Sequence, residues 1–193
     1  MNPGIFRAYD IRGVYGKDFE PRDFYFIAQA YARVFGPKQV ALGHDVRATS
    51  PELWQQAAEG LTEAGVDVLN LGPISTDMLY FGVVNYRTDG GMVISASHNP
   101  AEYNGIKMVR ENAIPISGDS GILDVRDEAL RLAQHGSGRP QSRGVVRSVD
   151  PMDDYLMHLR QFFDARSLGD TRLVLNANCG FAGEVAQRLL EGT

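Results

Sequence analysis

The sequence predicts an α/β fold: a three-layer α/β/α domain with a mostly parallel, mixed sheet, followed by the start of a second, similar domain. Strand-like runs alternate with amphipathic helical stretches, which is typical of parallel strands joined by crossover helices. The strand-like runs are also apolar almost throughout, as expected for strands that helices cover on both faces. Prolines and glycines mark the ends of the expected helices.

The first two helices have clear boundary signals. Pro21 fits the first helical position, and apolar residues recur at helical spacing until Gly36 ends the run. The second helix is expected to start at Pro51, with Ser50 as N-cap and Gly65 as the stop. The expected elements here are a strand-like stretch broken by charges at residues 5–14, a helix at 21–35, a strand at 39–43 and a helix at 51–64.

The next part of the chain repeats this alternation. Thr76 is a possible cap for the third helix. An apolar stripe at helical spacing predicts a fourth helix after the last strands. The expected elements are a strand at residues 66–72, a helix at 77–84, a strand at 91–95, a hairpin or edge pair at 106–109 and 113–116, and a helix at 122–133.

A domain boundary is predicted within residues 135–148, which are rich in Gly, Ser and Arg and are interpreted as a solvated linker. The domains are therefore assigned as residues 1–150 and 151–193. The second part should contain a connecting helix at 155–163, a strand at 173–176, a glycine-rich turn and a helix. One parallel strand with one helix cannot bury both of its faces, so this second domain is expected to be incomplete.

Composition and charge exclude several classes of protein, among them disordered, nucleic-acid-binding and membrane-spanning proteins. With 44% hydrophobic and 22% charged residues, the chain is expected to be globular. A net charge of −5 without a long basic run argues against nucleic acid as a partner. No apolar signal segment opens the chain, and no window approaches the roughly 18 apolar residues of a membrane span, so we expect a cytoplasmic protein without membrane contact. The single Cys179 is interpreted as a packed or inert thiol.

The segment "SASHNP" follows an expected strand, at the sheet edge where ligand sites gather in open α/β folds. Ser97 beside His98 suggests a nucleophile and a base. The Gly-x-Ser-x-Gly frame of serine hydrolases is absent, however, and neighbours on an extended segment point to opposite sides. Taken alone, the segment is more typical of a turn before Pro100.

Positive residues near the strand ends change this interpretation. Arg7, Arg12, Arg47 and Lys107 all lie in loop-like stretches, and each alone is typical of a solvated surface residue. Together with Ser97 they predict a phosphoryl site, because a phosphoserine carries about −1.5 to −2 charges and three strong acceptors that require such partners. Arginine supplies a fixed fork of donors, and lysine supplies a mobile point charge.

Three segments resemble the α-D-phosphohexomutases, specifically the phosphomannomutase/phosphoglucomutase branch. They are "FRAYDIRG" at residues 6–13, "GHDVRATSP" at 43–51 and, most specifically, "SASHNPAEYNGIK" at 95–107. The resemblance covers essentially the whole chain. It implies a mutase that interconverts hexose 6-phosphate and hexose 1-phosphate, with the choice between mannose and glucose left open.

The resemblance also implies a role for each site residue. Ser97 would be the phosphoserine, passing its phosphoryl group through a bisphosphorylated sugar, with hexose 1,6-bisphosphate as activator. Mg²⁺ would bind a phosphoserine oxygen, its other protein ligands coming from an aspartate loop that this chain lacks. Arg12 and Lys107 would position the phosphoryl group and stabilise its charge, and His98 would contact the phosphoserine region or the substrate. Tyr9 would line the sugar site, and Asn99 would bind substrate and hold the loop. Gly105 would allow a turn that directs Lys107 back to the site.

Some features depart from the family pattern. Asp77 stands where a proline is common, and "LNANCGFAG" at residues 175–183 replaces the usual turn sequence of the second domain. The resemblance implies that the C-terminal domains of the same protein are missing partners, so this chain alone is expected to be inactive. An alternative is a non-catalytic phosphate-binding or interaction module that docks through its unpaired strand.

Overall fold

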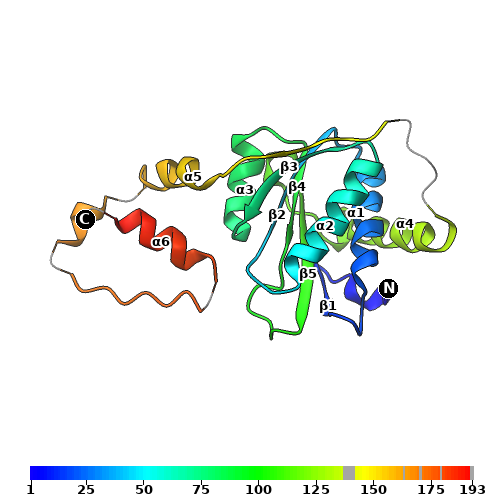
Figure 1. Cartoon of the computed structure of the whole chain (residues 1–193), viewed down its shortest axis with the longest axis horizontal. Helices are drawn as coiled ribbons and strands as arrows, with labels where there is room; N and C mark the ends of the chain where they lie inside the picture. The colour runs from blue at the N-terminus through cyan, green and yellow to red at the C-terminus, as the bar shows by residue number, and fades with distance from the viewer. Residues whose placement is uncertain (137–141, 163, 170, 179, 192–193) are drawn as a thin grey trace.

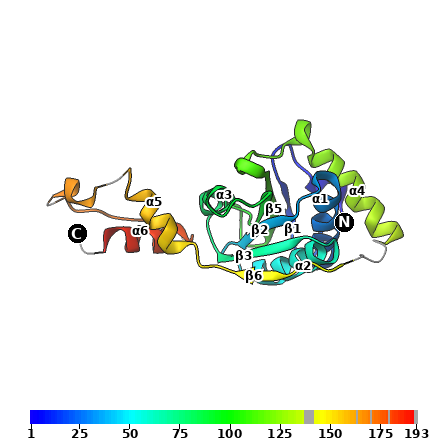
Figure 2. The same ribbon diagram turned by 90° about the horizontal axis from the view of Figure 1, so that it is seen from above.

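The computed structural model describes residues 1–136, 142–162, 164–169, 171–178 and 180–191. Its described residues form a six-stranded sheet with the order β1-β5-β4-β2-β3-β6. Helices cover both faces of this sheet, which gives three layers (Figures 1 and 2). The strands are β1 (Ile11–Val14), β2 (Gln39–His44), β3 (Asp67–Pro73), β4 (Gly90–Ile94), β5 (Tyr103–Arg110) and β6 (Val146–Ser148).

The sheet is mixed and mostly parallel, as the sequence predicts. β2 pairs in parallel with β3 and β4, and β3 pairs in parallel with β6. β5 is antiparallel to both β4 and β1, so it alone of the described strands is reversed. The carboxyl ends of β2, β3 and β4 therefore lie side by side, next to the beginning of β5.

Two apolar clusters fill the space between the layers. One lies under α1 (Pro21–Phe35), α2 (Ser50–Glu63) and α4 (Ile122–His135). The other lies under α3 (Thr76–Asn85) and extends to α5 (Met152–Leu159) and α6 (Ala182–Leu190). Among the described residues, no helix combines the length and apolar character needed to cross a bilayer.

The helix boundaries follow the sequence closely, with two corrected caps. α1 begins at Pro21 and ends before Gly36, as predicted. Ser50 is the first residue of α2 rather than its N-cap, because its hydroxyl donates to Asp45 Oδ1 at 2.5 Å. In α3 the cap is Ser75, one residue before the predicted Thr76.

The prediction of a solvated linker is wrong for residues 146–148. They form β6, which lies along β3 at the edge of the sheet and is exposed at every position. The pairing is supported by the backbone of Val145, whose carbonyl accepts from Val68 N at 2.8 Å and whose N–H donates to Asp67 Oδ1 at 2.9 Å. Part of the predicted linker, residues 137–141, lies outside the described residues.

The predicted hairpin or edge pair of residues 106–109 with 113–116 forms only in part: 106–109 belong to β5, but 113–116 form no full strand. A 3-10 turn at Glu111–Ala113 takes its place, with Asn112 and Ala113 at positive φ. An antiparallel bridge between Val109 and Pro115 joins the segment to β5, with backbone hydrogen bonds from Arg110 N to Ile114 O at 2.9 Å and from Ile116 N to Met108 O at 3.2 Å. Near the N-terminus, a 3-10 turn at Pro3–Ile5 reaches the start of the predicted stretch 5–14, whose strand is limited to Ile11–Val14.

The C-terminal part contains helices but no strand among its described residues. α5 starts at Met152, three residues earlier than predicted, and α6 forms as expected. The predicted strand at 173–176 is wrong: these residues lie in an extended loop outside the sheet (Figure 1). A strand needs a neighbour for its backbone groups, and the described residues after Ser148 supply none.

Candidate active site

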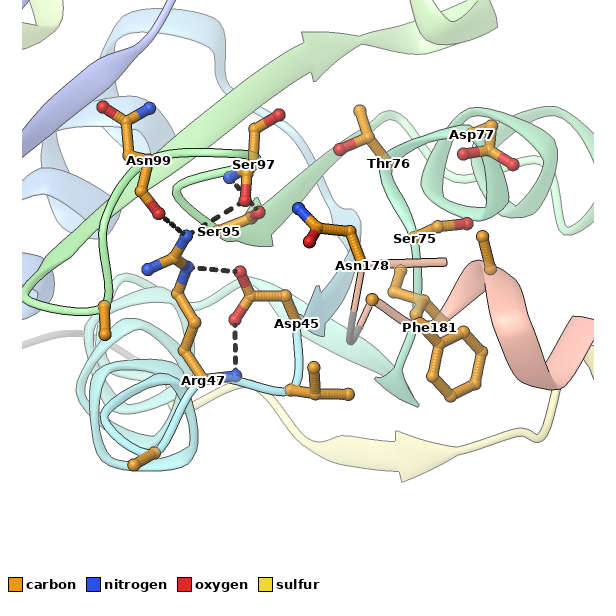
Figure 3. A pocket seen from close by; sticks show the side chains of 16 residues that line it. Asp45, Arg47, Ser75, Thr76, Asp77, Ser95, Ser97, Asn99, Asn178 and Phe181 are labelled. Carbon is orange, nitrogen blue, oxygen red and sulfur yellow. Dashed lines mark hydrogen bonds and ion pairs between the residues drawn. The ribbon is translucent and has the colours of Figure 1, made fainter. Parts of the chain in front are cut away.

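A cavity of about 680 Å³ opens at the carboxyl edge of the sheet. Its walls are the loop after β2, the β3–α3 connection and the loop between β4 and β5 (Figure 3). A fourth wall comes from the segment that leads into α6, including Asn178 and Phe181. Three predicted features, the strand ends, the "GHDVR" segment and the "SASHNP" segment, therefore meet at one place.

Ser97 lies on the rim of this cavity and is exposed. Its φ is +52°, a left-handed backbone conformation that non-glycine residues adopt rarely and at a cost of about 1–3 kcal/mol. The tight turn around it is held by Asn99, whose backbone N and side-chain Nδ2 each donate to Ala96 O at 3.0 Å. Ser97 N donates to Ser95 Oγ at 2.9 Å. The segment is thus both a turn, as the residues alone suggested, and a way to present a serine.

His98 contacts Ser97, which the argument from an extended backbone did not predict. The distance between Ser97 Oγ and His98 Nδ1 is 3.2 Å. Neighbouring side chains point to opposite sides only where the backbone is extended. The positive φ of Ser97 shows that the backbone is not extended here, so the two side chains can meet. Among the described residues, no carboxylate hydrogen-bonds to His98, so the acid of a serine-hydrolase triad is not in place.

Arg12 and Lys107 lie on the same face of the sheet, because Arg12 pairs with Gly105 and Lys107 is two residues further along β5. Arg12 Nη1 donates to Ala96 O at 2.8 Å, directly before Ser97. Its Nη2 pairs with Asp10 Oδ2 at 2.6 Å, and its buried Nε has no hydrogen-bond partner within the described chain. The structure therefore brings Arg12 to the serine loop with donor capacity left over.

Lys107 is next to Tyr9 rather than Ser97: its Nζ donates to the Tyr9 carbonyl at 3.4 Å. The Tyr9 side chain is 73% exposed. Neither Tyr9, Lys107, Arg12 nor His98 lines the cavity beside Ser97, whereas Asn99 does. Of the predicted site residues, Arg12, His98 and Asn99 thus contact or belong to the serine loop, whereas Tyr9 and Lys107 contact each other.

The predicted role of Gly105 is wrong. It lies inside the extended strand β5, and a Cβ atom there would overlap the Ile11 carbonyl oxygen. Gly105 is needed because β1 approaches β5 closely at this point, and Lys107 owes its direction to the strand itself.

Sequence reasoning missed a polar network beneath the serine loop. Asn104 is fully buried, and its Nδ2 donates to Thr49 Oγ1 and to Ser50 Oγ at 2.9 Å each. Ser50 Oγ in turn donates to Asp45, which pairs with Arg47. Arg47 was predicted to face a phosphate, but it contacts the loop backbone. The sequence shows only that polar residues cluster within "GHDVRATS" and within "YNG". Such clusters do not reveal that the two distant segments contact each other.

The fourth wall of the cavity is anchored through α5. Tyr155 donates from its hydroxyl to Asp77 Oδ2 at 2.5 Å, and Tyr86 donates to Asp154 Oδ2 at 2.8 Å. Burial first, and then these carboxylates, raise the pKa of both phenols, since the phenolate is disfavoured in each place. Asp77 therefore has a defined partner, which its position at the helix start alone did not indicate.

Metal binding is not supported by the side chains of this part of the protein. The described residues contain no group of three or more His, Cys, Asp or Glu side chains that could hold an ion. The donor that the resemblance assigns to Mg²⁺ here is a phosphate on Ser97. These residues do not form a Mg²⁺ site by themselves.

Comparison with known proteins gives concordant matches. Residues 3–130 match the family model described as phosphoglucomutase/phosphomannomutase, alpha/beta/alpha domain I. The chain is 44% identical over 183 residues to a phosphomannomutase of Salmonella typhimurium (strain LT2), covering 93% of this chain and 39% of that protein. It is 41% identical over 187 residues to a phosphomannomutase of Escherichia coli (strain K12), covering 95% and 40%.

The three-dimensional comparison agrees. A crystal structure of a phosphoglucomutase/phosphomannomutase family protein from Burkholderia thailandensis has a TM-score of 0.77 and 31% sequence identity, covering 99% of this chain and 42% of that chain. The present chain thus spans about two fifths of the length of these two phosphomannomutases.

Proposed function

The chain belongs to the phosphoglucomutase/phosphomannomutase family, and from that premise we propose that Ser97 carries the transferred phosphoryl group in the interconversion of hexose 6-phosphate and hexose 1-phosphate. The bond between phosphorus and Ser97 Oγ breaks as a bond to a sugar hydroxyl oxygen forms, and the resulting bisphosphate returns its other phosphoryl group to Ser97. The observation that supports this most directly is the exposed Ser97 at φ +52°, beside a cavity at the strand ends.

The surrounding residues have roles that fit phosphoryl transfer, which depends on positioning and charge more than on covalent chemistry. Arg12 is held at the carbonyl before Ser97, and the second N–H of each of its Nη atoms is a donor for a phosphate oxygen. Lys107 supplies a second positive charge on the same face. His98 Nδ1, 3.2 Å from Ser97 Oγ, can take or return the hydroxyl proton. Tyr9 and Asn99 would contact the sugar phosphate.

Two small molecules belong to the proposal. A hexose 1,6-bisphosphate would activate the protein by phosphorylating Ser97. Mg²⁺ would neutralise charge on the transferred group when bound. Because the described residues provide no ligand set for the ion, its remaining ligands, like the rest of the sugar site, would come from C-terminal domains such as those of the longer relatives.

Intact-mass analysis after incubation with glucose 1,6-bisphosphate tests the proposal. We expect one added phosphoryl group, abolished by Ser97→Ala and retained by the control Ser167→Ala in an exposed turn. The incubation is repeated with the C-terminal part of a phosphomannomutase relative added in trans, which separates a missing sugar site from a wrong serine. Phosphate on another residue, or none under both conditions, would contradict the proposal.

A second function is favoured by one observation: the side chains of Leu173, Val174 and Leu175 are 48%, 96% and 58% exposed. Such an apolar segment can add to the sheet edge of a partner, as an interaction module would. Light scattering over a concentration series discriminates, because a monomer at all concentrations that still accepts phosphate at Ser97 favours the enzyme.

A further inference from the structure

Arg47 directs all three nitrogens of its guanidinium at the protein itself. Nη1 donates to Pro100 O at 2.7 Å and to Tyr103 O at 3.1 Å, and Nη2 donates to Ser97 O at 3.0 Å and to Asn99 O at 2.5 Å. Nε lies 3.2 Å from Asp45 Oδ2 (Figure 3). Four of the five N–H donors of this guanidinium thus bond loop carbonyls, and the nitrogen that carries the fifth is paired with a carboxylate, so Arg47 is committed to the loop and not to a phosphate.

This arrangement separates Arg47 from Arg12. Both contact backbone carbonyls of the serine loop, but the Nε of Arg12 is buried without a partner, whereas every nitrogen of Arg47 is engaged. The Arg47 side chain is 14% exposed. Four carbonyls that span residues 97–103 therefore converge on one planar group, which restricts the loop far more than a single contact would.

The guanidinium is itself held in place from below. Asp45 Oδ1 accepts from Arg47 N at 3.0 Å and from Ser50 Oγ at 2.5 Å, and Ser50 accepts from the buried Asn104. This chain of bonds joins the start of α2, the start of β5 and the loop after β2. Arg47 is thereby supported on rigid elements, as a group that orients another residue must be.

We infer that Arg47 is a positioning residue for phosphoryl transfer: its contacts with the four carbonyls hold the β4–β5 loop in the form that keeps Ser97 in its left-handed conformation with Oγ facing the incoming phosphate. The inference rests on the proposed function of Ser97. A residue in this disfavoured backbone region needs surrounding contacts that fix it, and Arg47 bonds the carbonyl of that same residue. Arg47 acts through the loop and does not touch the phosphoryl group.

The test compares Arg47→Lys with wild type in the full chain, with Arg143→Lys as the matched control at an exposed site. Lysine keeps the charge beside Asp45 but has three donors on one atom and cannot span the carbonyls. Amide hydrogen exchange should accelerate at least about tenfold in residues 97–103 of Arg47→Lys and stay unchanged in α1. Exchange in Arg143→Lys should match wild type.

The functional measurement is the rate of Ser97 phosphorylation as the bisphosphate concentration varies. In Arg47→Lys the rate at saturation should fall by up to about 100-fold while the half-saturating concentration stays constant, since a serine displaced by about 1 Å loses that much. Added methylguanidinium should restore part of the rate in Arg47→Gly. If that variant does not fold, Arg47→Lys alone decides.

Each outcome has one meaning. Unchanged loop exchange in Arg47→Lys, or an unchanged rate at saturation, overturns the inference. A weaker half-saturation at an unchanged maximal rate also overturns it, because that result means Arg47 binds the phosphate. A wild-type chain that gains no phosphate either alone or with the added C-terminal part contradicts the proposed function, and the exchange measurement then still decides the claim about the loop.

Discussion

The strand β4 and the segment at residues 173–175 are both short apolar runs, yet the first is a buried strand and the second is an exposed loop. β4 lies between β2 and β5, and all five of its residues are buried. Leu173, Val174 and Leu175 have no neighbouring strand among the described residues and stay largely exposed. An apolar run becomes a strand when other strands satisfy its backbone N–H and C=O groups and other layers cover its side chains.

The same difference separates the two parts of the molecule. The sheet and its helices hold most of the buried apolar side chains, while the described residues of 151–191 contribute Met152, Tyr155, Leu156 and Val185. Hydrophobic stabilisation scales with the apolar area removed from water, at about 25 cal/mol per Å². The first part should thus unfold cooperatively, and the second should depend on its contacts with α3.

The strongest test of this difference in burial is to truncate one leucine in each part. Leu42 in β2 is fully buried, so Leu42→Ala should lower the free energy of unfolding by about 2–5 kcal/mol. Leu175→Ala should change it by no more than about 0.5 kcal/mol. Urea unfolding followed by circular dichroism measures both, and equal losses would show that 173–175 is buried in solution.

The next largest effect concerns the polar network under the serine loop. Asn104→Ala should cost about 1–3 kcal/mol, because the partners of the buried amide lose their hydrogen bonds. Asn176→Ala, which removes one exposed bond to Asn178 N, should cost about 0.5 kcal/mol or less. Thermal unfolding of both variants provides the measurement, and an Asn104 variant as stable as wild type would show that the network is dispensable.

The contact between the two parts gives a smaller effect. Tyr155→Phe should weaken the docking of α5 by about 1–2 kcal/mol, because the hydroxyl no longer reaches Asp77. Amide exchange should accelerate in α5 while α1 is unaffected, and Tyr80→Phe should leave both unchanged. Faster exchange in α1 as well would mean that the two parts unfold together.

The same contact predicts a pH dependence. The pKa of Tyr155 is raised above the ordinary 10.0, chiefly by burial and then by the bond to Asp77. The docked form favours the neutral phenol, so its stability is full below about pH 10 and declines as the pH rises further. Phenolate absorbance of wild type against Tyr155→Phe measures the titration. A Tyr155 that ionises at its ordinary pKa would argue against this docked arrangement.

The smallest effect is expected at the surface of α6. Arg188 Nη2 donates to Glu184 Oε1 at 2.7 Å, and both side chains are exposed. Arg188→Ala should cost no more than about 0.5 kcal/mol, and less in high salt. Arg131→Ala in α4 should cost more, because Glu128 accepts two bonds from Arg131 and one from Arg33. Thermal unfolding of both variants at two ionic strengths measures these losses of stability. Equal losses would show that the ion pair in α6 contributes as much as the one in α4.

Much of the fold and the centre of the site could be predicted from the residues. Pro21 and Gly36 delimit α1 because their backbone preferences act locally. The "SASHNP" segment and its position after a buried strand indicate the loop at the strand ends where the cavity lies, and the role of Ser97 stays a prediction. The wrong cap at Ser50 has a different origin: its hydroxyl binds Asp45, a choice that the local sequence does not reveal.

By itself, the sequence determined the order of the helices and main strands, the mixed α/β class and the serine loop, since propensity and periodicity act over a few neighbouring residues. Only the tertiary structure decided that β5 is reversed, that Arg12 and Lys107 share a face, that Arg47 holds carbonyls 50 to 56 positions away, and that 173–176 forms no strand. These features depend on hydrogen-bond partners distant in the chain, and a backbone or guanidinium donor acquires its partner only once the layers have packed.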